Sequence, residues 1–127
     1  MGYYLANASV SATARHPKPH YGAFLSQDLG PDLSGSLQGA GGIGGLVAVK
    51  TGDSAYIPCA DANGNITEYL DTNGTIVAHR EFDPYGNTLV QTGSKAQEFT
   101  LWFSSKYWDV ETGLGWWGYR YYHPDEG

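Results

Sequence analysis

A short repeat built on aspartate and glycine constrains the fold more than any other feature of this sequence. Three consecutive units, "DANGNITEYL" from residue 61, "DTNGTIVAHREF" from residue 71 and "DPYGNTLVQ" from residue 83, begin with Asp and have Gly at the fourth position. Each unit then continues into a run rich in β-branched and aromatic residues, which is typical of a strand. The repeat therefore predicts successive β-hairpins over residues 56–93.

Dipeptides within these units indicate how the chain turns. Asn63-Gly64 and Asn73-Gly74 supply the positive φ angles that a two-residue type I′ hairpin turn needs. Pro84 presets the φ angle of its position in the third turn. We assign turn roles to Asp61, Asn63, Gly64, Asp71, Asn73, Gly74, Asp83, Pro84, Gly86, Asp109 and Gly113.

The strand-like runs between the turns alternate in side-chain character. Residues 66–70 and 76–79 follow this pattern, with Tyr69 opposing its neighbours Glu68 and Leu70. Neither face is purely apolar, so a ribbon of these strands cannot bury itself alone. It needs further hairpins or a larger sheet, as repeat architectures do.

Residues 99–122, "FTLWFSSKYWDVETGLGWWGYRYY", carry a heavy aromatic load around a further turn from Asp109 to Gly113. We expect two strands here, whose aromatic side chains contact one another across the hairpin. The expected contacts join Trp102, Phe103, Tyr107 and Trp108 to Trp116, Trp117, Tyr119, Tyr121 and Tyr122.

The first part of the chain has fewer strand signals. Residues 1–28 form an unassigned, loop-rich segment, because the prolines of "HPKPHYG" exclude regular helix and a central strand. Residues 29–45 contain seven of the 18 glycines and should be mostly turn and loop. "LVAVK" and "AYIP" then read as the two arms of a hairpin.

Composition limits the fold class and the partners. The chain has 127 residues, enough for one domain, and its glycine and aromatic content favours an all-β fold. A formal charge of −6 with only seven Lys and Arg leaves no basic surface for nucleic acid. A single cysteine, Cys59, excludes an intrachain disulfide. No run approaches the roughly 20 apolar residues that span a bilayer, so we expect no membrane insertion.

Two motifs imitate nucleotide sites but lack the context that their chemistry needs. "GAGGIG" matches the dinucleotide fingerprint at Gly39, Gly41 and Gly44, yet "LVAVK" follows where the fingerprint requires a helix. "GGLVAVKT" imitates a phosphate loop, but Val49 occupies a position where the cradle requires glycine. We therefore expect no cofactor.

The candidate metal-binding and catalytic groups also lack the context that their chemistry needs. The spacing of Asp61, Asn63 and Asn65 imitates a calcium loop whose glycine comes too early. His16 and His20 stand beside prolines that prevent their presentation on one helix face. The sequence has no Gly-x-Ser-x-Gly elbow and no recognisable nucleophile and base pair. We expect neither a bound metal nor enzymatic activity.

Three stretches follow one another in the second part of the chain: "DLSGSLQGAGGIGGL", "CADANGNITEYLDTNGTIVAHREFDPYGNTL" and "FSSKYWDVETGLGWWGYRYYHPDEG". In this order they resemble the Rhs (YD-repeat) family, specifically the RHS-repeat-associated core of bacterial polymorphic toxins. The resemblance covers residues 29–127, and residues 1–28 match nothing in it. Phe82-Asp83 takes the place of the family's Tyr-Asp pair.

The resemblance implies a segment of a larger β-shell that encloses or presents a C-terminal toxin. It implies other shell segments, further copies of the chain or a toxin cargo as partners, in a secreted or cell-surface setting. In that family an aspartate-dependent self-cleavage beyond the core releases the cargo. Since the sequence stops at Gly127, ahead of the family's cleavage element, we expect a core truncated at its C-terminal end.

We therefore expect an all-β, non-catalytic structural segment, and two other functions stay open. An extracellular carbohydrate-binding module would stack sugar rings on exposed Trp and Tyr side chains of residues 116–121. A self-cleaving protease remnant would use Asp83 as its acid, although a catalytic dyad needs a second positioned carboxylate.

Overall fold

The structure, a computed structural model, describes residues 9–10 and 25–126. Within these residues the chain has strands and one short 3-10 turn but no α-helix, which confirms the all-β prediction. The strands are β1 Ser9–Val10, β2 Leu25–Leu29, β3 Leu46–Thr51, β4 Ser54–Ala60, β5 Ile66–Leu70, β6 Ile76–Phe82, β7 Thr88–Thr92, β8 Tyr107–Asp109, β9 Leu114–Trp116 and β10 Tyr121–Tyr122. The 3-10 turn, η1, is Phe103–Ser105.

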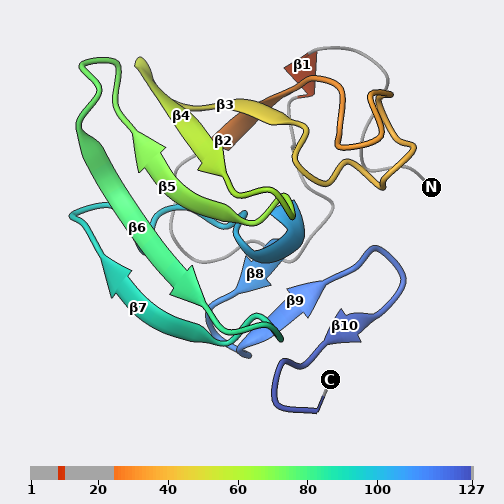
Figure 1. Cartoon of the computed structure of the whole chain (residues 1–127). Helices are drawn as coiled ribbons and strands as arrows, with labels where there is room; N and C mark the ends of the chain where they lie inside the picture. The colour runs from red at the N-terminus through yellow and green to blue at the C-terminus, as the bar shows by residue number, and fades with distance from the viewer. Residues whose placement is uncertain (1–8, 11–24, 127) are drawn as a thin grey trace.

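The first sheet is an antiparallel meander of seven strands in the order β1-β2-β3-β4-β5-β6-β7 (Figure 1). Every strand lies beside its neighbour in sequence, as hairpin repeats require. β2 pairs with β3 from Leu25 onward, so the sheet begins before the expected boundary between residues 28 and 29. Of residues 1–28, only 9–10 and 25–28 lie within the described part of the chain.

The Asp-x-x-Gly units close the hairpins by a different turn from the one predicted. In the first unit the Gly64 N–H donates to the Asp61 carbonyl at 3.0 Å, and the Asp61 N–H donates to the Asn65 carbonyl at 2.9 Å. Gly64 has a φ of 79°, whereas Asn63 has no positive φ. The turn is therefore a type I turn followed by a glycine bulge, and the predicted type I′ turn is wrong.

The aspartate side chain is the physical reason for this geometry. The Asp61 carboxylate accepts the N–H groups of Asn63 and Asn65, both at 2.9 Å. This Asx-turn favours the right-handed conformation in the residues that follow the aspartate. Asp71 and Asp83 accept the N–H groups two and four residues further on in the same way.

The second sheet is a three-stranded antiparallel sheet in the order β10-β9-β8. Tyr107 of β8 lies opposite Trp116 of β9, and Trp116 lies opposite Tyr121 of β10. The turn between β8 and β9 begins at Asp109, whose carbonyl accepts the Gly113 N–H at 2.9 Å. This sheet is the aromatic hairpin expected from the sequence, with a third short strand added to it.

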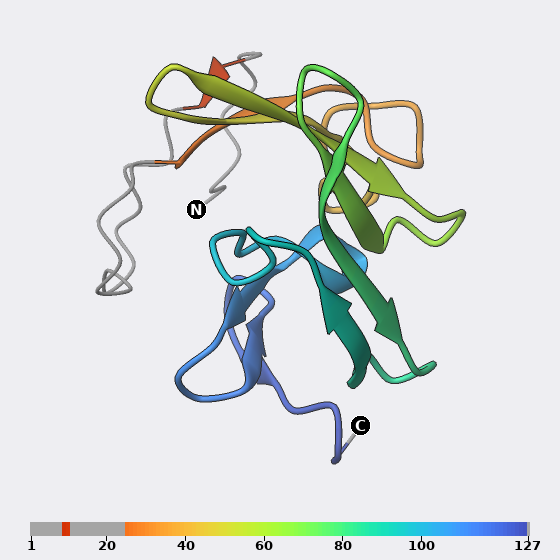
Figure 2. The ribbon, with the colours of Figure 1, turned by 90° about the vertical axis from the view of Figure 1, so that its left-hand side faces the viewer.

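The core lies between the first sheet and residues 93–106, which link β7 to β8 (Figure 2). Tyr69 of β5 stacks on Phe99 with ring centroids 3.9 Å apart and meets Trp102 edge to face at 5.2 Å. The Tyr69 hydroxyl donates to the Leu101 carbonyl at 2.7 Å, and the Trp102 indole N–H donates to the Phe99 carbonyl at 2.8 Å. Both polar groups are therefore satisfied where water is excluded.

The core position of Trp102 contradicts the prediction that it contacts aromatic residues across the hairpin. Trp102 is fully buried and packs on the first sheet. The reason is η1, which turns the chain between Trp102 and Tyr107, so that these residues do not belong to one continuous strand.

Strands β5 and β6 pair along only part of their length. The paired residues are Glu68 with His79, Tyr69 with Ala78 and Leu70 with Ile76. At the start of β5, the Ile66 N–H instead donates to the Trp102 carbonyl at 2.9 Å. Strands β5 and β6 thus separate beyond the pair of Glu68 and His79, and the chain around η1 lies between them.

Candidate functional site

The glycine-rich loop before β3 is organised around one buried carboxylate. Asp32 is 6% exposed, and its oxygens accept the N–H groups of Ser34 (2.9 Å), Ala40 (2.7 Å) and Gly42 (3.0 Å). The Ser34 hydroxyl also donates to it at 2.6 Å. These hydrogen bonds, the one from the Ser34 hydroxyl first, lower the pKa of Asp32 to about 2. The loop is thereby ordered without regular secondary structure.

A single serine joins this loop to the first Asp-x-x-Gly turn. The Ser105 hydroxyl accepts the Gly44 N–H at 2.9 Å and donates to the Gly64 carbonyl at 2.7 Å. The adjacent Ser104 N–H donates to the side-chain carbonyl of Asn65 at 2.9 Å. Ser104 and Ser105 have φ angles of 52° and 54°, a left-handed conformation that serine rarely adopts. We call Gly44, Gly64 and Ser105 the three-segment junction.

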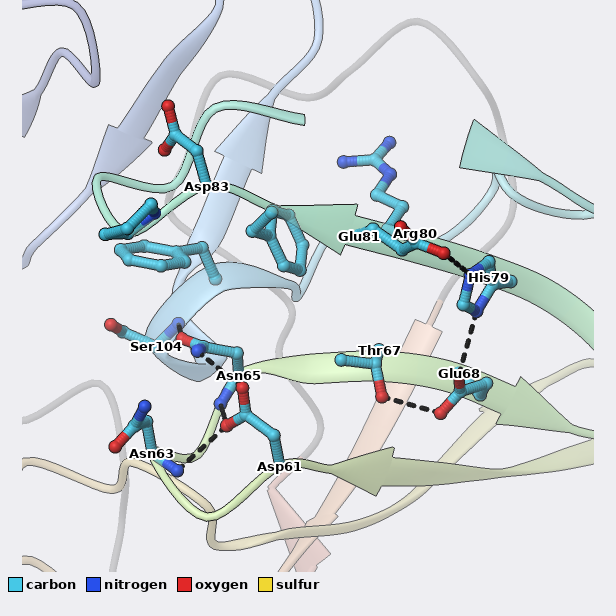
Figure 3. Close-up of a pocket in the computed structure, with 13 residues that line it drawn as sticks. Asp61, Asn63, Asn65, Thr67, Glu68, His79, Arg80, Glu81, Asp83 and Ser104 are labelled. Atoms are coloured by element: carbon cyan, nitrogen blue, oxygen red, sulfur yellow. Dashed lines mark hydrogen bonds and ion pairs between the residues drawn. The ribbon is translucent and has the colours of Figure 1, made fainter. Parts of the chain in front are cut away.

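An open hollow of about 670 Å³ lies where β5 and β6 separate (Figure 3). One side comes from the first Asp-x-x-Gly turn and β5, and the other comes from β6 and the third turn. The lining residues are Asp61, Asn63, Asn65, Thr67, Glu68, His79, Arg80, Glu81, Phe82, Asp83, Pro84, Phe103 and Ser104. Carboxylates outnumber cationic groups among them, so the hollow is acidic.

A histidine is held between two carboxylates at the point where the strands divide. His79 Nδ1 lies 2.8 Å from Glu68 Oε1, and His79 Nε2 lies 3.3 Å from Glu81 Oε1. The Thr67 hydroxyl donates to the other Glu68 oxygen at 2.6 Å. The hydrogen bond to Glu81, followed by the one to Glu68, raises the pKa of His79. We call Glu68, His79 and Glu81 the carboxylate–histidine bridge.

Arg80 lies on the face of β6 opposite to His79, and its charged side chain lies in the core. Its side chain is 2% exposed, and its guanidinium carbon lies 4.2 Å from the centre of the Trp102 ring. One guanidinium N–H donates to the Ala96 carbonyl at 3.4 Å. Burial lowers the pKa of Arg80 to about 10, so the group stays charged at neutral pH.

The predicted turn residues are not gathered into one site. Asp61 and Asp83 both line the hollow. Asp71 lies at the other end of the β5–β6 hairpin, and Asp109 belongs to the second sheet. Each of these aspartates accepts hydrogen bonds within its own turn, so the four do not form a shared site.

Of the aromatic contacts predicted across the turn, Phe103 stacks on Tyr122 with ring centroids 6.4 Å apart, whereas two other pairs form within residues 116–122. Trp116 meets Tyr121 at a centroid distance of 4.9 Å, and Trp117 meets Tyr122 at 4.8 Å. Trp108 lies opposite Gly115. Tyr119 and Tyr121 are 86% and 56% exposed. Among the aromatic side chains of residues 99–122 these two are the most exposed, so a ligand could reach them most easily.

Sequence reasoning missed Asp32, Arg80, Ser105 and the carboxylate–histidine bridge. Asp32 had a usable signal, because a serine follows it at the second position, as in an Asx-turn. Arg80 alternates with the buried Ala78 along β6, which indicated an inward side chain. Ser105 had no local signal, because both of its partners lie about 40 or more residues away in sequence.

The motifs that imitate cofactor sites lie in ordinary structural positions. Gly39, Gly41 and Gly44 belong to turns that lead into β3, the strand that stands where the fingerprint would need a helix. Lys50 of the phosphate-loop imitation lies on β3 and forms an ion pair with Asp28 at 2.9 Å.

Residues 9–10 and 25–126 contain no group of three or more His, Cys, Asp or Glu side chains placed to hold a metal ion. His16 and His20 lie outside the described residues. In the described part of the chain we also find no helix with the length and apolar character of a membrane span.

Asp83, the candidate acid of a self-cleaving protease, uses its carboxylate to accept hydrogen bonds within its own turn. Its carboxylate accepts the N–H groups of Tyr85 (2.8 Å) and Asn87 (2.9 Å) and the Asn87 side-chain amide (2.9 Å). The Asn87 amide, ahead of these backbone contacts, lowers the pKa of Asp83. A general acid at neutral pH needs the opposite shift.

The fold of the chain is similar to part of several solved toxin structures. Similar solved structures are the complex TcdB2-TccC3, the complex TcdB2-TccC3-Cdc42 and the Photorhabdus luminescens Tc holotoxin pore, with TM-scores of 0.60, 0.60 and 0.61. Each is 23% identical and covers 80% of this chain, which spans 5% of the matched one. The similarity shows a shared fold and is consistent with an Rhs-type region.

No family model matches the sequence, and no curated protein is significantly similar to it.

Proposed function

We propose that the chain is a non-catalytic structural segment of an Rhs/YD-repeat β-shell that encloses or presents a C-terminal toxin or effector. One observation carries this proposal: the fold of 80% of the chain recurs as 5% of a Tc toxin chain. A hairpin meander with three consecutive turns built on the same aspartate geometry suits a wall that is extended by adding hairpins. The partners would be other shell segments or further copies of the chain.

Strand β7 is the edge on which such a partner would pair. All five of its residues, Thr88–Thr92, are exposed, and Leu89 and Val90 are 65% and 37% exposed. The strand "TLVQT" contains no charge and no proline, the usual protections of a free edge. An unprotected edge favours pairing with another strand.

The test is the association state of the chain. Light scattering at tens of micromolar, an order of magnitude at which exposed edges associate, should show species larger than a monomer. Val90→Lys should reduce association by charging the edge, whereas Val110→Lys, which charges an exposed turn, should not. A strictly monomeric chain would contradict the proposal and favour a closed binding module.

A carbohydrate-binding module is the second candidate, and the exposure of Tyr119 and Tyr121 favours it. Exposed rings can stack on sugar faces. Calorimetry with soluble oligosaccharides tests it, since saturable heat that Tyr119→Ala abolishes would support sugar binding. Absence of heat with every oligosaccharide of the panel would remove this candidate.

A further inference from the structure

Two turns of this chain carry the same Asn-Gly pair in the same local geometry. In each, the glycine N–H donates to the aspartate carbonyl at 3.0 Å, and the aspartate carboxylate accepts the asparagine N–H at 2.9 Å. Asn-Gly is the dipeptide most open to spontaneous deamidation, because glycine has no side chain to shield its backbone nitrogen. The two sites share this dipeptide and its turn and differ in the packing around them.

The surroundings of Gly64 restrict its backbone. It is buried, its carbonyl accepts the Ser105 hydroxyl at 2.7 Å, and a methyl group at its Cα would collide with Ile43. Asn65, which follows it, is bonded to Asp61 and to the Ser104 N–H. Any rearrangement of the Asn63-Gly64 backbone must break the three-segment junction.

Gly74 has no such neighbours. Asn73 and Gly74 are both exposed, and no atom outside residues 73–75 lies within 4 Å of the position that a Gly74 Cβ would occupy. Here the backbone can rearrange at the cost of the turn hydrogen bonds alone. Local opening of such a loop tip requires less free energy than opening of a packed turn.

We propose that Asn73 is a site of spontaneous deamidation and that packing protects Asn63. The deprotonated backbone nitrogen of Gly74 attacks Cγ of Asn73. The N–Cγ bond forms, the bond from Cγ to the side-chain nitrogen breaks, and ammonia leaves. Water then opens the succinimide at either carbonyl to give aspartate or isoaspartate, with no change of oxidation state.

This reaction goes beyond the proposed structural role, because it gives one hairpin a finite chemical lifetime. Isoaspartate routes the main chain through the side-chain carbon of residue 73 and inserts a methylene before Gly74. The inserted methylene then displaces the Thr75 N–H, which the Asp71 carboxylate accepts in the intact turn. Both products also place a new negative charge beside Asp71.

Peptide mapping by mass spectrometry tests the proposal on the full chain in warm, mildly alkaline buffer. In the folded chain, the peptide with Asn73 should gain the mass of an amide-to-acid exchange several-fold faster than the peptide with Asn63. In concentrated urea the two rates should converge, which provides the internal control. Equal rates in the folded chain, or faster reaction at Asn63, would overturn the proposal.

A variant separates packing from local sequence. Ser105→Ala releases the Gly64 carbonyl, so it should raise the rate at Asn63 and leave the rate at Asn73 unchanged. If both rates rise to their urea values, the variant has unfolded, and Ile43→Ala then makes the same comparison. An unchanged Asn63 rate in a folded variant contradicts protection by packing.

Discussion

Aspartate acts in two distinct settings in this chain. At Asp71 and Asp83 it caps an exposed hairpin turn, and accepted hydrogen bonds lower the pKa of both carboxyl groups. At Asp32 it lies inside a loop and gathers N–H groups from residues up to ten positions away. The turn role of Asp71 and Asp83 can be predicted from a local sequence pattern, whereas the role of Asp32 depends on a loop that closes around its carboxylate.

Asp32→Asn should destabilise the chain and change its response to acid. The pKa of Asp32 is about 2 in the folded chain, below the usual value of about 3.9. Its ionised form therefore contributes stability above pH ~4, and this contribution is lost as the pH falls toward ~2. The amide nitrogen of asparagine cannot accept the N–H groups of Ala40 and Gly42.

Thermal unfolding followed from neutral pH to acid measures this effect. The variant should melt at a lower temperature at neutral pH and lose less stability on acidification than the parent chain. Asp53→Asn, which removes the same charge from an exposed turn, is the matched control. Equal acid sensitivity of the Asp32 variant and the parent would contradict the role of this carboxylate.

Ser105→Ala should lower the free energy of unfolding by about 1 to 3 kcal/mol, because it leaves a buried N–H and a buried carbonyl without their partner. Ser104→Ala is the control, since its backbone has the same handedness and its contact to Asn65 uses the backbone N–H. Urea unfolding of both variants provides the comparison. Equal losses would mean that the hydroxyl of Ser105 has no special role.

At the scale of strands and turns, the sequence predicts local features well and distant ones poorly. The hairpins around Asp61, Asp71 and Asp83 follow from a pattern of Asp, Gly and alternating side chains within a dozen residues. The division between β5 and β6 could not be predicted, because its cause is η1, which lies more than 30 residues after β5 in the sequence. The core position of Trp102 could not be predicted for the same reason.

The carboxylate–histidine bridge makes the β5–β6 hairpin sensitive to pH. The pKa of His79 is raised in the folded chain, so the bridge contributes full stability below the unfolded value of about 6.5. This contribution is lost as the pH rises through the folded-state pKa. The chain should therefore melt at a higher temperature at pH ~6 than at pH ~8.

Replacement of the histidine tests this expectation. His79→Gln should remove most of the difference in melting temperature between these two conditions. His123→Gln, which changes an exposed histidine near the C-terminal end, should leave the difference in place. A pH response that survives His79→Gln would show that other groups produce it.

At the scale of the whole molecule, aromatic rings fasten the second sheet to the first. Phe103 lies between Phe82, at a centroid distance of 5.7 Å, and Tyr122, at 6.4 Å. The Tyr122 hydroxyl also donates to the Tyr85 carbonyl at 2.6 Å. The Phe103 ring lies directly against Gly86, where a methyl group would come within 2.6 Å of Cδ1. The third turn is thus also a contact between the sheets.

Gly86→Ala should destabilise the chain more than Gly74→Ala does. Both glycines have a positive φ, 95° and 83°, so each variant carries the strain of a left-handed alanine, about 1 to 2 kcal/mol. Only at residue 86 does the new methyl group also displace the Phe103 ring. Urea unfolding measures both losses, and tryptophan fluorescence of the second sheet reports its release. Equal losses would contradict a packed contact at this turn.

The three-segment junction also determines the order in which the chain can assemble. Every strand of the meander pairs with its neighbour in sequence, so each hairpin can form as soon as it leaves the ribosome. The junction cannot close until Ser105 has emerged, more than 40 residues after Gly64. Until then the glycine-rich loop has no anchor at Gly44. The Ser105 hydrogen bonds therefore form after the hairpins that they join, and their loss in Ser105→Ala should accelerate unfolding in stopped-flow measurements while refolding keeps its rate.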